Sequence, residues 1–169
     1  KQHGYEKIFL KNTGDIFCKE RTDLLQYAYF YHGFKEYKEL NTYIDFDQYK
    51  ENIVSNFTQG KRSHVNRCER EGLQIRELHT EEEIRIYYKI LCENLQKYHV
   101  KPVHTVEELI DFKQHRLKEE CGFFGCYLAE EMIAGSMMFY FHNCGTAHTQ
   151  YLSAKESYNR LSPMTYMYY

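Results

Sequence analysis

The sequence predicts an α+β fold in which a mainly antiparallel sheet is flanked by helices. Two Thr-x-x-Glu pairs, each followed by apolar residues three or four positions apart, indicate capped amphipathic helices in the middle of the chain. Three apolar or alternating stretches follow, separated by short polar breaks, and indicate a meander of strands. A Ser-Pro step after them is typical of the start of one more helix.

The first part of the chain predicts short elements. The apolar runs KIFLKN and IFCKE flank a turn at residues 12–15 and indicate strand-like pieces. RTDLLQYAYFYHGF has Thr22 as a candidate N-cap and Gly33 as a stop, which indicates a short amphipathic helix. ELNTYIDF then alternates as a strand does.

The next part predicts two helical segments and a strand. Apolar side chains four positions apart favour a helix over residues 47–57. GKRSHVNRCEREG indicates a second helical run, closed by Gly72. LQIRELH then alternates as a strand does.

The two capping boxes are Thr80 with Glu83 and Thr105 with Glu108. They predict helices over residues 83–99, with an apolar stripe, and from about 106 to about 120. The three strands that follow are predicted at about 123–128, 132–141 and 146–153, and the last helix at Ser162-Pro163.

Composition limits the classes of function. The 169 residues carry a formal net charge of -2, which argues against a wholly basic nucleic-acid-binding protein but leaves room for a local basic patch. No apolar run reaches the roughly 18 residues of a membrane span. Six cysteines without a C-x-x-C pair are typical of reduced thiols that pack in an intracellular, here cytoplasmic, protein. The chain begins without Met and ends inside an unfinished helix, so we expect truncation at both ends.

Two groups of polar residues are candidates for chemistry. Lys61, Arg62 and Arg67 share one predicted helix, which is either a solvated face or a site for a compact anion. His148 is a candidate general base because an imidazole titrates near neutral pH, although a lone His is more often structural. No C-x-x-C pair accompanies the histidines, so no metal is expected. The many Tyr and Phe side chains are explained by core packing, and no Gly-rich nucleotide loop or hydrolase elbow is present.

Three blocks taken in order give a more specific signal. They are NFTQGKRSHVNRCEREGLQIRE, LAEEMIAGSMMFYF and HTQYLSAKESYNRLSPMTYMYY. In this order they resemble the GNAT N-acetyltransferase superfamily, most closely its double-domain branch of BioF2-like acetyltransferases and Fem-type aminoacyltransferases. The resemblance implies that residues 1–36 are the tail of a preceding GNAT-like half and that residues 37–169 are a GNAT-like acyltransferase domain whose last strands lie beyond the chain.

The resemblance also implies a function and a site. An acyl group would move from a thioester donor, acetyl-CoA or another acyl-CoA, to a small-molecule or cell-envelope amine without a covalent enzyme intermediate. The donor would lie along an exposed strand edge with its phosphates at the next helix start, the His148 base would border that edge, and the basic helix would hold an anionic part of the acceptor. The implied donor-binding residues are Thr149, Gln150, Tyr151, Leu152, Ser153, Ser162, Met164 and Thr165, and the implied acceptor-binding residues are Lys61, Arg62 and Arg67.

One departure from the family keeps two alternatives open. KESYNRLSP stands where GNAT enzymes carry a Gly-rich pyrophosphate loop, as it does in the Fem-like branch. The first alternative is therefore a Fem-type enzyme that transfers an aminoacyl group from tRNA to a cell-wall precursor. The second is a catalytically silent GNAT-like interaction module.

Overall fold

The structure is a computed structural model that describes residues 4, 6–20, 23–49 and 53–169. The chain divides into two compact units. The first comprises Lys1–Asn41 and Phe141–Thr146, and the second comprises Thr42–Tyr140 and Ala147–Tyr169.

In the first unit, the described residues form the α-helix α1 (Leu24–Tyr31) and a 3₁₀ turn at Asp15–Phe17. The helix ends as expected at Gly33, which adopts a positive φ, whereas the predicted N-cap Thr22 lies outside the described residues. The prediction of strand-like pieces at KIFLKN and IFCKE was wrong, because the described residues there form no strand. An alternating segment becomes a strand only when a second strand pairs with it, and none does here.

The segment before the second helix also differs from the prediction. The strand expected at ELNTYIDF is not formed: residues 39–45 have no regular secondary structure and lead into a 3₁₀ turn at Phe46–Gln48. The helix expected over residues 47–57 is replaced, where the chain is described, by a 3₁₀ turn at Ile53–Asn56. Residues 50–52 of that prediction lie outside the described residues.

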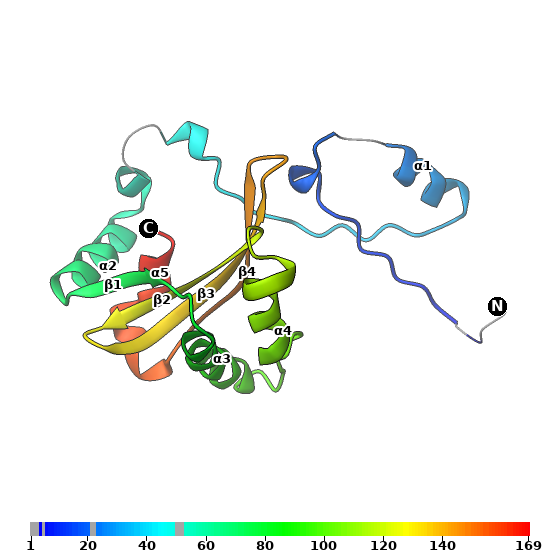
Figure 1. The fold of residues 1–169 in the computed structure, drawn as a ribbon. Helices are drawn as coiled ribbons and strands as arrows, with labels where there is room; N and C mark the ends of the chain where they lie inside the picture. The colour runs from blue at the N-terminus through cyan, green and yellow to red at the C-terminus, as the bar shows by residue number, and fades with distance from the viewer. Residues whose placement is uncertain (1–3, 5, 21–22, 50–52) are drawn as a thin grey trace. The chain divides into compact units, whose positions relative to one another are not determined.

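The core of the second unit is a four-stranded antiparallel sheet with strand order β1-β2-β3-β4 (Figure 1). The strands are β1 (Leu73–Glu77), β2 (Cys121–Leu128), β3 (Glu131–Phe141) and β4 (Thr146–Ala154). This confirms the predicted meander. The tight turn between β2 and β3 uses a positive φ at Ala129, and the β2–β3 register shifts between Cys126 and Tyr127.

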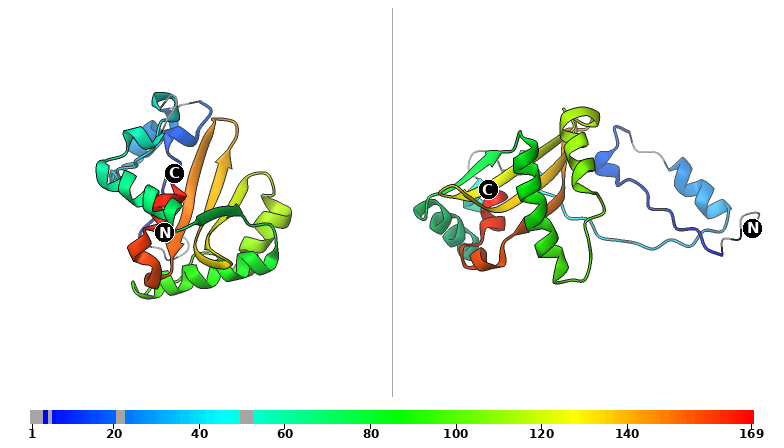
Figure 2. Two further views of the ribbon diagram at one scale, coloured as in Figure 1. Left: turned by 90° about the vertical axis from the view of Figure 1, so that its left-hand side faces the viewer. Right: turned by 60° about the horizontal axis from the view of Figure 1, so that its bottom comes forward.

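Helices cover both faces of the sheet (Figures 1 and 2). On one face lie α3 (Glu81–Gln96) and α4 (Val106–Asp111), each opened by its predicted capping box. The chain continues from α4 into a π-helical turn at Phe112–Arg116, which ends the helix earlier than the sequence predicted. The core beneath these helices is formed mainly by Leu78, Ile84, Tyr87, Ile90, Leu109, Phe123 and Met137.

On the other face lie α2 (Gln59–Arg70), a 3₁₀ turn at Glu156–Leu161 and α5 (Pro163–Met167). Helix α2 begins and ends close to its predicted position, and α5 begins at the predicted Pro163 but ends at Met167, before the last residues given. A smaller core lies under them, formed by Cys68, Leu73, Cys126, Ile133, Ala134, Ala154 and Leu161. Within the described residues, no helix combines the length and apolar character that a membrane crossing requires.

Candidate functional site

The strand assigned to the thioester donor, β4, is an edge strand of the sheet. The Lys155 N–H donates to the Ile133 carbonyl on β3 at 2.9 Å. In an antiparallel ladder the backbone groups of alternate residues point to the same side, so those of Tyr151 and Ser153 point toward β3. The N–H and C=O groups of Gln150 and Leu152 therefore point away from β3, along the open edge.

The two faces of β4 differ in chemistry. Ala154 packs in the core under α2 and α5, so alternation turns Tyr151 and Ser153 toward α3 and His148 away from it. Ser153 is fully buried, and its hydroxyl has no hydrogen-bond partner among the described residues. His148, the predicted base, is exposed.

The tertiary structure brings two of the predicted site residues together. Lys61, in the first turn of α2, donates from Nζ to the Thr165 hydroxyl of α5 at 3.2 Å. This contact places the Lys61 ammonium beside a residue expected to bind the donor, rather than at a separate acceptor site. A cation and a hydroxyl are both suitable partners for a phosphate oxygen.

The two arginines of the predicted acceptor site do not join this contact. Arg67 donates from a guanidinium nitrogen to the Arg160 carbonyl at 2.6 Å, which ties α2 to the 3₁₀ turn before α5. Arg62 donates to the Ser55 carbonyl at 3.0 Å. Both guanidinium groups therefore hold neighbouring backbone in place.

The start of α5 offers fewer backbone donors than the sequence suggested. Ser162 adopts a left-handed conformation with φ of 56°, and Pro163 follows it at the first helical position. The Thr165 N–H already donates to the Ser162 carbonyl at 3.0 Å. The Thr165 side-chain hydroxyl, rather than its N–H, is thus the group positioned to meet a ligand.

A histidine that the sequence analysis did not select lies against the middle of β4. His104 Nδ1 is 2.9 Å from the Tyr151 hydroxyl, which also accepts the Val103 N–H at 3.2 Å. The Tyr88 hydroxyl donates to the His104 carbonyl, and the His104 ring packs edge-on against Phe112. Contacts to its carbonyl, its Nδ1 and its ring therefore hold His104 in place. No local sequence pattern indicated this residue.

The cysteines described by the structure are free thiols, and three of them are buried. Burial raises the pKa of Cys121 to about 11 and that of Cys126 to about 12, and it also raises the pKa of Cys68. A thiol with a raised pKa is a weak nucleophile at neutral pH because little thiolate forms. Among the residues described, no three His, Cys, Asp or Glu side chains are grouped as metal ligands would be.

Comparison with known proteins adds no family assignment. No protein-family model matches the chain, and a search among curated proteins returns no match.

Proposed function

We propose that this protein is a GNAT-like N-acyltransferase that moves an acyl group from a thioester donor to an amine. The observation that carries the proposal is the position of β4. Residues 149–153, assigned to the donor, lie on an edge strand, and Thr165 of α5, assigned to its phosphates, contacts Lys61 of α2. An extended amide-containing ligand can pair with such an edge as a further strand would.

The outward-facing groups of Gln150 and Leu152 would bind the amides of the donor arm. Lys61 and Thr165 would bind its phosphates, which gives Lys61 a donor-binding role in this proposal. The amine nitrogen would attack the thioester carbonyl and form an amide bond as the C–S bond breaks. The amine proton passes to a base, and the thiolate takes up a proton as it leaves.

His104 and Tyr151 are the better placed pair for the proton transfer. The Val103 N–H donates to the Tyr151 oxygen, and in the tautomer of His104 with an unprotonated Nδ1 the Tyr151 hydroxyl donates to that nitrogen. A proton taken from the amine by Tyr151 can therefore move on to His104. His148 remains the alternative base, since it borders the same strand on the other face.

Calorimetric titration of the protein with acetyl-CoA and with free CoA tests the donor. Gln150→Pro removes one outward N–H but no ladder donor, and proline is tolerated at such edge positions. Gln150→Ala is the matched control, because it shortens the same side chain and keeps the N–H. We expect binding that is weakened roughly tenfold by Gln150→Pro and by Lys61→Met, in line with the loss of one hydrogen bond to a charged or amide group, and little changed by Gln150→Ala.

The same titration separates the alternatives. Binding of aminoacyl-tRNA without binding of CoA favours the Fem-type donor, which the structure allows because the 3₁₀ turn at Glu156–Leu161 replaces a Gly-rich loop. Binding of neither donor contradicts the proposal and favours the silent module. Once turnover is measured, loss of the acidic limb of the pH–rate profile in His104→Ala, but not in His148→Ala, supports the Tyr151–His104 route, and the reverse result supports His148, because a general base must be deprotonated to act.

A further inference from the structure

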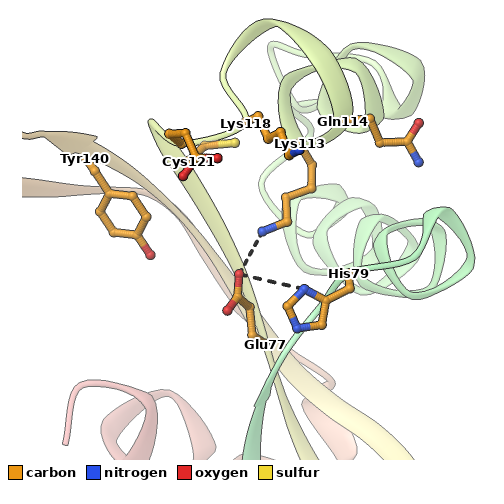
Figure 3. A pocket seen from close by; sticks show the side chains of 8 residues that line it. Glu77, His79, Lys113, Gln114, Lys118, Cys121 and Tyr140 are labelled. Carbon is orange, nitrogen blue, oxygen red and sulfur yellow. Dashed lines mark hydrogen bonds and ion pairs between the residues drawn. The ribbon is translucent and has the colours of Figure 1, made fainter.

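A polar hollow lies elsewhere in the same unit, at the end of the sheet where β1 ends and β2 begins (Figure 3). Its volume is about 510 Å³, which is within the range of small-molecule sites. None of the residues around β4 and α5 discussed above lines it. The lining residues are Glu77, His79, Lys113, Gln114, Lys118, Glu119, Cys121 and Tyr140.

An ion pair fixes the centre of this hollow. Lys113 Nζ is 2.7 Å from Glu77 Oε1, and the Lys113 side chain is only 14% exposed. Lys113 belongs to the π-helical turn after α4, a kind of turn that often occurs at functional sites. His79 Nδ1 lies 4.0 Å from the same Glu77 oxygen. The hydrogen bond from Lys113 lowers the pKa of Glu77, so its carboxylate is ionised at neutral pH.

A tyrosine and a glycine shape the opposite wall. The Tyr140 hydroxyl lies over Gly122, in space that a Cβ at this position would occupy. Figure 3 shows this hydroxyl on the other side of the hollow from His79, with the Glu77 carboxylate between them. Burial, followed by the charge of Glu77, raises the pKa of Tyr140, so the phenol stays protonated and can donate or accept a hydrogen bond.

The charges of the wall select the chemistry of a ligand. Glu77 and Glu119 are acidic, whereas Lys113 and Lys118 are basic, so a ligand with one sign of charge is repelled by part of the wall. A ligand with both signs meets an opposite charge at each end. We infer that this hollow binds a free α-amino acid, with its ammonium group toward Glu77 and Tyr140 and its carboxylate toward Lys118 and Lys113.

This inference does not depend on acyl transfer, because its readout is binding in the absence of any thioester. NMR titration of the protein with each standard L-amino acid, up to about 10 mM, is the experiment. The N-acetyl derivative of a bound amino acid lacks the ammonium, and its amide lacks the carboxylate. We expect saturable shifts with at least one free amino acid and at least tenfold weaker binding of both derivatives.

Three variants test the assignment of residues. Glu77→Gln and Lys113→Met each leave one ligand charge without its partner and should weaken binding at least tenfold. Gly122→Ala should also weaken it, because the new Cβ displaces the Tyr140 hydroxyl. Lys89→Met, on the exposed surface of α3, is the control and should bind as the unaltered protein does.

The inference is overturned if no amino acid produces saturable shifts. It is also overturned if either derivative binds as well as the free amino acid. Finally, if Glu77→Gln and Lys113→Met, with unchanged circular dichroism spectra, both keep full affinity, the hollow does not hold the ligand.

Discussion

Gly135 and Gly122 provide a direct test of how tightly the second unit is packed. At Gly135, on β3, a Cβ would lie 2.9 Å from Tyr87 Cε2, closer still to Tyr87 Cδ2, and 3.1 Å from the backbone oxygen of Phe124. Tyr87 is fully buried and Phe124 contributes backbone, so neither neighbour can withdraw. We expect Gly135→Ala to cost about 2–3 kcal/mol, the upper part of the usual range of about 1–3 kcal/mol for overpacking a closed core.

Gly122 is the matched comparison on the neighbouring strand. Its Cβ would lie even closer to a tyrosine, but the nearest atom is the hydroxyl at the far end of Tyr140, which borders the open hollow and can swing outward. Replacement of a strand glycine also lowers the entropy of the unfolded chain, which favours the variant by about 0.5–1 kcal/mol. The two effects nearly cancel, and we expect Gly122→Ala to change stability by less than about 1 kcal/mol.

Urea unfolding followed by circular dichroism measures both variants. If the dependence of the free energy of unfolding on urea concentration has the same slope in both variants, the difference in midpoint concentration multiplied by that slope gives the difference in the free energy of unfolding. In thermal unfolding, Gly135→Ala should lower Tm by roughly 6–12 °C, since about 1 kcal/mol corresponds to a few degrees in a unit of this size. A larger loss in Gly122→Ala than in Gly135→Ala would refute the argument that the mobility of the neighbouring atom, rather than its distance, sets the cost.

Three further predictions concern single side chains. Ser153→Ala should raise the free energy of unfolding by about 1 kcal/mol, because it removes a buried hydroxyl without a partner; a thermal unfolding curve that moves to lower temperature would show that the hydroxyl is satisfied after all. Thr80→Ala should cost about 1 kcal/mol, since it removes the N-cap that accepts the Glu83 N–H, whereas Thr80→Ser should retain most of the stability. The pKa of Glu77 is lowered in the folded state, so its contribution is present above the unfolded pKa and is lost as the pH falls through the folded pKa. Glu77→Gln should therefore flatten the fall in Tm below about pH 4.5, and a fall as steep as that of the unaltered protein would show that the Lys113 pair contributes nothing.

The sequence by itself determined the elements whose stabilising interactions are local. The hydroxyl of each N-cap Thr accepts the N–H of the Glu three positions later, and the carboxylate of that Glu accepts the N–H of the Thr. The starts of α3 and α4 therefore follow from a few neighbouring residues. The meander of β2, β3 and β4 was predictable for a similar reason, because consecutive strands joined by short turns pair with each other. The alternating segments near the N-terminus carried the same kind of pattern but have no such neighbour, and they form no strand.

The candidate sites were decided by tertiary structure alone. Lys61 and Thr165 are 104 positions apart, and His104 and Tyr151 are 47 apart. The hollow beside Glu77 likewise joins residues from β1, the π-helical turn, β2 and β3. The order of the strands and the helix packing on each face set these distances, and a periodic pattern read along the chain reports which face a residue occupies, not which distant residue it meets there.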